Sequence, residues 1–256
     1  MPWSDWLGAL AQRHPDRIAV MDAASRRSHT YRSFDNRANQ IAHFCERWVG
    51  LLPGDRVGLL STPSDDVLQI VVAAGKLGLT ALLLDPAAAP EDLIQAINQY
   101  SPRTVFHGLA QADLVRAIWF KVDSVEHFIP LRGMVDTANF EDIAAHYPPT
   151  PPFRELEENA PWVCFADKGI TWPTLEEAAG YPPPGAGLSV VAGPLYRPAG
   201  LAAAVRGLGS AQCVVVEGEV LRVIESPPEM SPSDEQWSDS QRNVPTGPSW
   251  LPHEFL

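Results

Sequence analysis

Hydrophobic and polar positions along the first half of the chain alternate between helical and strand patterns. Between Tyr31 and Gly50 the apolar residues recur at intervals of three and four, which predicts a helix with Thr30 as its N-cap and Gly50 as its C-terminal stop. Short apolar runs predict strands at residues 56–60, 80–84 and 103–106, and Ser64 and Pro90 mark the starts of two further helices. Because strands separated by helices at this spacing are typical of a parallel sheet covered by helices, the predicted fold class is α/β.

The second half of the chain shows similar patterns after a stretch rich in proline and acidic residues. Apolar runs at residues 162–165, 188–191 and 212–216 predict strands of a second sheet, and residues 199–208 are predicted to be helical. From residue 226 the chain is rich in Pro, Ser and acids without periodicity, which predicts a disordered tail. The predicted organisation is a first α/β subdomain at 1–147, a linker at 148–161, a partial second α/β subdomain at 162–225 and a tail at 226–256.

Composition limits the classes of partner that the chain can have. Asp and Glu total 31 against 19 Lys and Arg, which gives a net charge of −12. Because this charge repels a polyanion, we do not expect nucleic acid as a partner. The longest apolar stretch, residues 67–84, is interrupted by polar residues, and the N-terminus lacks a basic region followed by an apolar run. We therefore expect no signal peptide, no membrane span and a cytoplasmic location.

Cysteine and histidine spacing gives no support for a metal site. The three cysteines, Cys45, Cys164 and Cys213, lie far apart, so neither a disulfide framework nor a structural zinc site is expected. The seven histidines show neither H-x-x-x-H nor H-E-x-x-H spacing. Cys164, in an apolar run, is expected to be a small buried hydrophobe.

The order of several segments resembles the start of the adenylate-forming enzymes, a superfamily that includes acyl- and aryl-CoA synthetases and the adenylation domains of peptide synthetases. The resemblance covers roughly residues 5 to 217 and rests on these segments taken in order: Arg13–Val20, Thr30-Tyr31, Pro53–Val57, Asp85-Pro86, and Gly193–Arg197 with Gly200. It implies the large N-terminal α/β domain of these enzymes, with parallel sheets flanked by helices. It also implies an activity: forming an acyl adenylate from a carboxylic acid and ATP, then passing the acyl group to coenzyme A or a carrier thiol.

The phosphate-binding loop departs from the family pattern. The family sequence Tyr-Thr-Ser-Gly-Thr-Thr-Gly-x-Pro-Lys-Gly follows a strand, whereas here residues 166–175 read Ala-Asp-Lys-Gly-Ile-Thr-Trp-Pro-Thr-Leu. Thr174 stands at the lysine position, one glycine replaces three, and Asp167 places a carboxylate where an anion should bind. Lys168, Gly169 and Thr171 are the residues expected to form a vestigial phosphate loop. Family members are about twice as long, so we expect a truncated relative restricted to the N-terminal half.

These departures lead to three hypotheses about function. The first is a catalytically inactive relative that acts as a binding, partner or scaffold protein, with no catalytic residue, cofactor or metal, and with a protein partner or homo-oligomer expected. Trp237 and Trp250 in the tail would then mark a docking site. The second is a component of an ATP-dependent carboxylic acid–CoA or carrier-protein ligase, active with ATP/AMP and Mg only when a second chain is present.

The third hypothesis is a binder of a small carboxylic acid or acyl ligand, based on the segment that resembles the family's acyl pocket. Tyr196, Arg197 and Gly200 are the expected substrate-binding residues, because a guanidinium can pair bidentately with a carboxylate. The simpler interpretation is that Arg197, beside Pro198 at a helix start, is a solvated surface residue.

Overall fold

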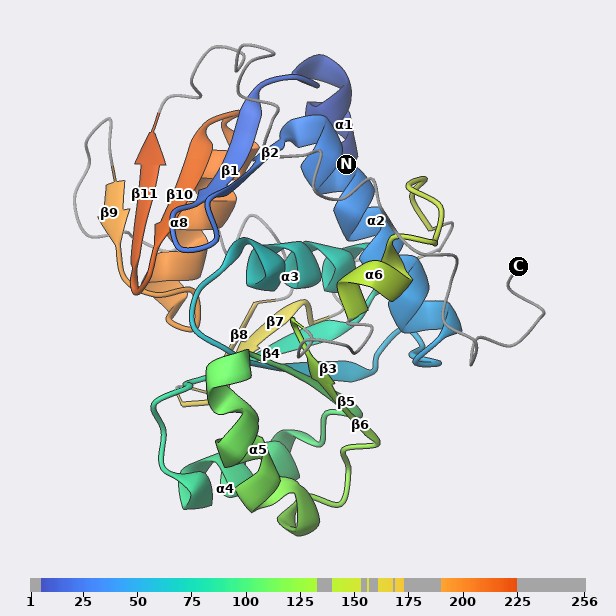
Figure 1. The fold of residues 1–256 in the computed structure, drawn as a ribbon, viewed down its shortest axis with the longest axis vertical. Helices are drawn as coiled ribbons and strands as arrows, with labels where there is room; N and C mark the ends of the chain where they lie inside the picture. The colour runs from blue at the N-terminus through green and yellow to red at the C-terminus, as the bar shows by residue number, and fades with distance from the viewer. Residues whose placement is uncertain are drawn as a thin grey trace.

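Two sheets and the helices around them make up the part of the chain that the computed structural model describes: residues 6–132, 140–152, 156, 161–167, 169–172 and 190–224 (Figure 1). The helices are α1 (Trp6–Arg13), α2 (Tyr31–Arg47), α3 (Asp65–Leu77), α4 (Pro90–Tyr100), α5 (Ala112–Ile118), α6 (Phe140–Ala144) and α8 (Pro198–Gly209), with short 3-10 turns η2 (Leu109–Gln111) and η3 (Trp119–Lys121).

The larger of the two sheets has six strands. Its order is β6 (His127–Pro130), β5 (Thr104–His107), β3 (Arg56–Leu60), β4 (Thr80–Leu84), β7 (Val163–Phe165) and β8 (Ile170–Trp172). The first five strands run parallel, and β8 pairs antiparallel with β7. This confirms the predicted α/β class with a parallel sheet flanked by helices. The predicted strands at 56–60 and 80–84 have the bounds expected from the sequence.

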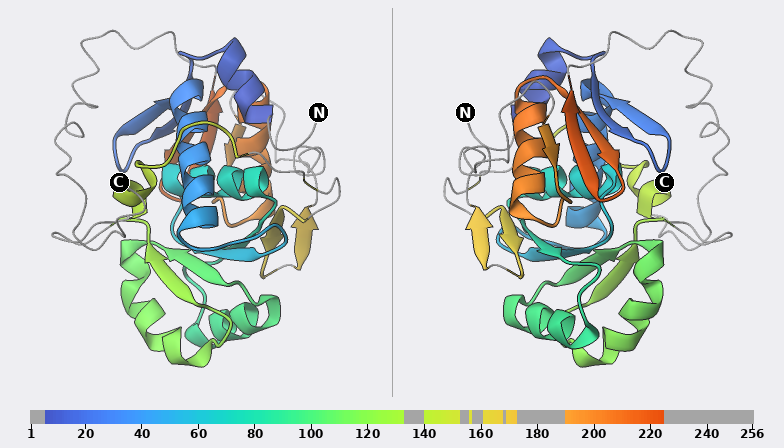
Figure 2. Two further views of the ribbon diagram at one scale, coloured as in Figure 1. Left: turned by 90° about the vertical axis from the view of Figure 1, so that its right-hand side faces the viewer. Right: turned by 90° about the vertical axis from the view of Figure 1, so that its left-hand side faces the viewer.

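Helices cover both faces of this sheet. Helices α4 and α5 lie below it, and α2 and α3 lie above it (Figure 1). Every residue of β4 is buried, as expected for a strand covered on both faces. Figure 2 shows α3 between the two sheets, with the second sheet above it. The largest apolar cluster is continuous from Leu83 of β4 through Ile70 of α3 to Val214 in the second sheet.

The five-stranded second sheet combines strands from both ends of the described chain. Its order is β2 (Arg27–Thr30), β1 (Ile18–Asp22), β10 (Cys213–Glu217), β11 (Val220–Ile224) and β9 (Val190–Ala192). Only the β1–β10 pairing is parallel, and the other three pairings between described strands are antiparallel. The expectation of a second parallel sheet is therefore wrong for most of its pairings.

The assignment of residues 162–165 to the second sheet is also wrong. Strand β7 pairs parallel with β4, with Ala81 opposite Val163 and Leu83 opposite Phe165, and so belongs to the six-stranded sheet. Its three residues are all buried, which suits an inner strand of that sheet. Both sheets thus take strands from each side of the predicted linker. The subdomain boundaries at 147 and 162 stay predictions, and the predicted tail lies outside the described residues.

Local capping explains where the helices begin and end. The side-chain oxygens of Thr30 and Ser64 accept hydrogen bonds from the backbone N–H groups three residues later, at 3.1 and 3.3 Å, as predicted for N-caps. Helix α3 ends at Leu77, and its C-cap Gly78 adopts a left-handed conformation with φ of 73°. Helix α2 ends at Arg47 with Trp48 as its C-cap, so Gly50 lies beyond the helix end and does not terminate it directly as predicted.

Candidate functional site

The carboxyl ends of the parallel strands bring polar side chains to one edge of the six-stranded sheet. Asp85 follows β4 and Asp167 follows β7, and these two strands are neighbours. In open α/β sheets, ligands bind outside the carboxyl ends of the strands. Arg197, at the start of α8, contacts both of these aspartates, so candidate site residues from the two sequence segments meet at this edge.

Arg197 joins these two carboxylates. It is the N-cap residue of α8, directly before Pro198 in the first turn. Its Nη2 lies 2.5 Å from Asp85 Oδ2, and its Nη1 donates to Asp167 Oδ2. The Arg197 guanidinium also lies 5.6 Å from the centre of the Tyr196 ring. We call Arg197, Asp85 and Asp167 the Arg197 triad.

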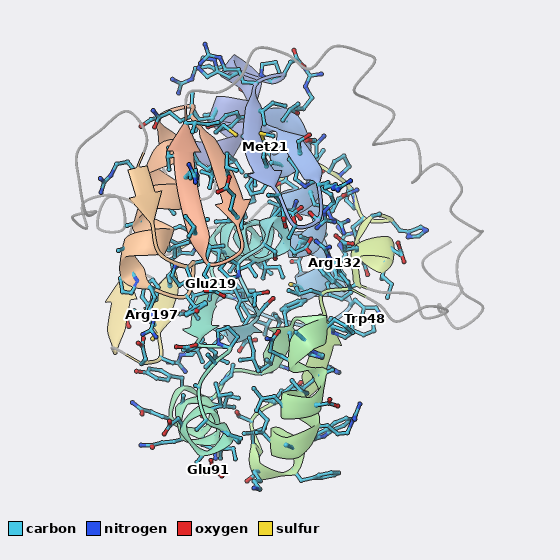
Figure 3. All side chains as sticks on the ribbon, turned by 60° about the vertical axis from the view of Figure 1, so that its left-hand side comes forward. Met21, Trp48, Glu91, Arg132, Arg197 and Glu219 are labelled. Atoms are coloured by element: carbon cyan, nitrogen blue, oxygen red, sulfur yellow. The ribbon has the colours of Figure 1, made fainter. Side chains whose placement is uncertain are left out.

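The neighbouring segment is fixed by further contacts. The Tyr196 hydroxyl donates to Glu219 Oε2 at 2.7 Å, which ties the start of α8 to the β10–β11 turn. Partial burial, together with the hydrogen bond to the Glu219 carboxylate, raises the pKa of Tyr196. Figure 3 labels Arg197, at the start of α8, and Glu219, in the turn between β10 and β11. The polar ends of Tyr196 and Arg197 are therefore both engaged by carboxylates of the chain itself.

Gly200 has a structural reason to be glycine. A Cβ at this position would lie 2.2 Å from the backbone oxygen of Pro194 and 2.3 Å from that of Gly193. Any side chain would therefore collide with the backbone that leads into α8. This close approach of the backbone accounts for the glycine at position 200, and its predicted role in substrate binding stays a prediction.

The predicted phosphate loop is described only in part, because Lys168 lies outside the described residues. Gly169 has a left-handed φ of 62°, and its N–H donates to the Phe165 oxygen at 3.0 Å. The Thr171 hydroxyl lies 3.5 Å from Cys164 Sγ, on the strand that precedes the loop. Cys164 itself is buried, which confirms the prediction of a small buried hydrophobe.

The electrostatics of the triad oppose a bound phosphate. One guanidinium faces two carboxylates, so the triad carries a net charge of −1 when all three groups are ionised. An incoming anion would have to displace a carboxylate from Arg197 and leave it uncompensated. In the described part of the chain there is also no group of three or more His, Cys, Asp or Glu side chains arranged to hold a metal ion.

Sequence reasoning missed Asp85 as a site residue. In the sequence, Asp85-Pro86 marks only a strand end and a part of the family resemblance, yet Asp85 is a partner of Arg197 across 112 residues of chain. The signal that could have identified Asp85 is its position at the carboxyl end of a buried parallel strand. The simpler interpretation of Arg197 as a solvated residue misses these partners, because the partly exposed side chain is held by two carboxylates.

Comparison with known proteins identifies the family. Residues 8–165, more than half of the 256-residue chain, match the family described as AMP-binding enzyme. The chain is 30% identical over 129 residues to a 3-methylmercaptopropionyl-CoA ligase of Ruegeria lacuscaerulensis, a match that covers 50% of this chain and 22% of the ligase. It is 32% identical over 110 residues to an N-(5-amino-5-carboxypentanoyl)-L-cysteinyl-D-valine synthase of Amycolatopsis lactamdurans, covering 43% of this chain and 3% of the synthase.

Solved structures share the fold. The N-terminal domain of FACL13 from Mycobacterium tuberculosis superposes with a TM-score of 0.71 and 18% identity, covering 93% of this chain and 59% of that one. A long-chain-fatty-acid-CoA ligase (FadD1) from Archaeoglobus fulgidus gives a TM-score of 0.72 and 15% identity, covering 86% of this chain and 47% of that one.

Two findings limit what these similarities mean. The chain spans less than two thirds of each relative named above, and the structural matches at this identity show the fold alone. Within the described residues, no helix is both long and apolar enough to cross a lipid bilayer. From the match over residues 8–165, the chain belongs to the AMP-binding enzyme family.

Proposed function

We propose that this chain is a non-catalytic binding or partner protein built on the AMP-binding fold. The Arg197 triad is the observation that carries this proposal. Arg197 stands in the segment that resembles the family's acyl pocket, and Asp167 stands in the segment that resembles its phosphate loop. Their ion pair joins the two places where an acid and a nucleotide would bind.

The described loop residues also fit a triphosphate poorly. A phosphate cradle needs several free backbone N–H groups and a nearby cation. Here the Gly169 N–H already donates to the Phe165 backbone oxygen, and the Thr171 hydroxyl lies against Cys164. Asp167 adds a negative charge to the loop. These contacts support the expectation that neither ATP nor Mg is a cofactor of the chain by itself.

A direct test measures ATP binding and adenylate formation by the purified chain. Isothermal titration with ATP, and pyrophosphate exchange with a panel of carboxylic acids, are expected to give no signal. The matched variant Asp167→Ser removes the carboxylate from the loop and should raise ATP affinity if Asp167 is what repels the phosphates. ATP-dependent adenylate formation by the unmodified chain would refute the proposal.

A second candidate function is a ligase component that needs another chain. It is favoured by the match over residues 8–165 to a family of AMP-binding enzymes, together with the match to a CoA ligase of which this chain covers 22%. The partner would have to supply the groups that hold ATP and Mg. Co-purification followed by pyrophosphate exchange decides this, because no exchange in any isolated complex would exclude it.

The small-acid hypothesis makes a different prediction for the same residues. A carboxylic acid or acyl ligand at Tyr196, Arg197 and Gly200 would have to compete with Asp85 and Asp167 for the Arg197 guanidinium. Replacing both aspartates with asparagine should then strengthen binding of acetate or benzoate, and Arg197→Ala should abolish it. If Arg197→Ala leaves acid binding unchanged, the ligand does not use this site.

A further inference from the structure

Aromatic side chains gather where the six-stranded sheet ends at β6. Among the described strands only β5 pairs with β6, which makes β6 the edge strand on that side (Figure 1). The His127 ring lies 6.0 Å from the ring of Trp48, the C-cap of α2, which Figure 3 labels. The Phe128 ring lies 6.1 Å from that of Trp119 in η3, directly after α5. Because successive side chains of a strand point to opposite faces, these rings continue from one face of the sheet around its edge to the other.

The exposed end of this series is a pair of stacked rings. Trp119 and Phe120 have ring centres 6.0 Å apart and planes inclined by only 17°. Phe120 is 90% exposed, Trp119 56% and Trp48 38%, and these are three of the six large apolar side chains that are exposed in the described part of the chain. We call the following five side chains the aromatic row: Trp48, Trp119, Phe120, His127 and Phe128.

Buried neighbours hold the row in place from inside. Trp48 stacks on the buried ring of Phe44, with ring centres 5.1 Å apart and planes inclined by 14°. Phe128 packs against the apolar cluster that includes Val105 of β5. Side chains that are already fixed lose little conformational freedom when a partner covers them, which favours association. The row is therefore a preorganised contact surface.

The backbone of β6 is poorly suited to the addition of another strand. The Leu131 N–H donates to the His107 oxygen at 2.9 Å, and backbone groups of successive strand residues point alternately to the two sides. The residues that point away from β5 are therefore Phe128 and Pro130, and Pro130 has no N–H group. Proline on an edge strand is a common protection against further pairing. A partner would bind this surface through the side chains of the row instead of as an added strand.

The charges beside the row suit a second copy of the same chain. Copies that each carry a net charge of −12 repel one another over most of their surfaces. The charged residues directly next to the row in the sequence are Arg47, Lys121 and Glu126, so the excess of negative charge is absent here. Both signs are present, as a contact between identical surfaces requires. An anionic lipid surface, in contrast, would repel the net charge of the whole chain.

The exposed area of the row approaches what a dimer needs. A whole aromatic side chain offers about 150–250 Å², so the exposed parts of Trp48, Trp119 and Phe120 come to about 400 Å² per copy. Two copies in contact would bury about 800 Å² from these rings alone, out of the roughly 1,200–2,000 Å² of a stable interface. The polar rim that surrounds the apolar centre of an interface supplies the remainder.

We propose that the aromatic row is the interface of a two-fold symmetric dimer of this chain. Trp119 and Phe120 form the centre of the contact, and the charged residues beside the row form its rim. Because the same surface is used by both copies, the assembly is closed and ends at two chains. The dimer does not rest on the proposed lack of catalysis, since ATP binding and dimer formation are measured separately.

Sedimentation velocity of the whole chain over a range of concentrations tests the dimer. The unsubstituted chain should pass from monomer to dimer as its concentration rises to about 100 µM, without larger species. Phe120→Ser should raise the dissociation constant of the dimer by at least about tenfold, because aromatic residues at the centre of an interface carry most of the binding free energy. Val220→Ser, at an exposed apolar side chain of β11, is the matched control and should leave the dissociation constant unchanged.

Each outcome decides the proposal. A chain that is monomeric at about 100 µM overturns it, as do oligomers that grow beyond two copies and a dimer that Phe120→Ser leaves intact. Flotation with phosphatidylcholine vesicles tests a lipid surface as the alternative, and vesicle binding by a chain that does not dimerise would also overturn the proposal. If circular dichroism shows that Phe120→Ser does not fold, Trp119→Ala takes its place. A dimer that is weakened in either variant and unchanged in Val220→Ser supports the proposal.

Discussion

Arg197 offers a test of how much the triad contributes to stability. Arg197→Ala leaves Asp85 and Asp167 close together without their cation. Because the side chains of all three residues are partly exposed, solvent screens the interaction, and we expect a loss of only about 1 kcal/mol in the free energy of unfolding. Urea unfolding of Arg197→Ala, Asp85→Asn and the double variant measures the coupling between the two side chains.

The control for this cycle is a more exposed ion pair between two strands of the second sheet, β10 and β11. Arg222 pairs with Glu217 at 2.9 Å, with side chains 52% and 40% exposed. Arg222→Ala should change the free energy of unfolding by less than about 0.5 kcal/mol. A loss in Arg197→Ala no larger than in this control would mean that the triad is only a surface contact.

Tyr31 provides a prediction for a fully buried polar group. Its side chain is completely inaccessible, and its hydroxyl lies 2.9 Å from the Leu208 oxygen and 2.7 Å from the Gln212 oxygen. Tyr31→Phe leaves carbonyl oxygens at the end of α8 without this donor, so unfolding in urea should show a loss of about 1–2 kcal/mol. An unchanged midpoint and slope would contradict the assigned hydrogen bonds.

At this scale the sequence predicted local contacts and missed distant ones. The caps Thr30 and Ser64 could be predicted because each bonds to a backbone group three residues away. The partners of Arg27 and Arg197 lie up to 114 and 112 residues away, and nothing in a single sequence pairs such charges. This is why the partners of these two arginines became visible only in the fold.

Two of the three glycines in helix α8 should respond differently to the same substitution. Gly200→Ala places a methyl group 2.2 Å from the Pro194 oxygen, so the backbone before the helix must move, and we expect a loss of more than about 2 kcal/mol. At Gly209, the last residue of the helix, an added methyl group would meet no heavy atom within 4 Å, so Gly209→Ala should be neutral or slightly stabilising.

Thermal unfolding of the two glycine variants compares them directly. Since both substitutions are in one helix and add the same methyl group, differences in helix propensity largely cancel. Gly200→Ala should lower Tm well below that of Gly209→Ala. Equal Tm values would show that the segment Gly193-Pro194 can move aside at little cost.

Element prediction succeeded where burial alone determines the pattern. Strands β3 and β4 are apolar runs whose ends are marked by the residues next to them in the chain. Their bounds could therefore be predicted from the sequence. Strand β2 escaped prediction because its four residues, Arg-Ser-His-Thr, are polar and none is buried. The sheet to which residues 162–165 belong depends on their pairing with β4, and a pairing partner cannot be read from the strand's own residues.

At the scale of the whole molecule, two ion-pair clusters connect the sheets. The Arg197 triad joins α8 to the ends of β4 and β7. In the second cluster, Asp65 and Asp66 at the start of α3 pair with Arg27 of β2, and Asp66 also pairs with Arg132 after β6. Both lie at the carboxyl edge of the parallel strands, where this class of sheet usually binds ligands. The edge is thus held together by the chain's own charges at both sides.

The three cysteines test whether the two sheets unfold as one unit. Cys45, Cys164 and Cys213 are free and buried, on α2, β7 and β10 respectively. Burial raises the pKa of Cys45 and Cys213 to about 12, so the native chain should react with Ellman's reagent only through unfolding. Because the main apolar cluster runs from the six-stranded sheet through α3 into the second sheet, all three thiols should react at one common rate that rises with guanidinium concentration.

Mass spectrometry of partly reacted chains assigns the rate of each thiol, and a fully denatured sample gives the three-thiol control. Labelling of Cys213 well before Cys164 would show instead that the second sheet opens separately.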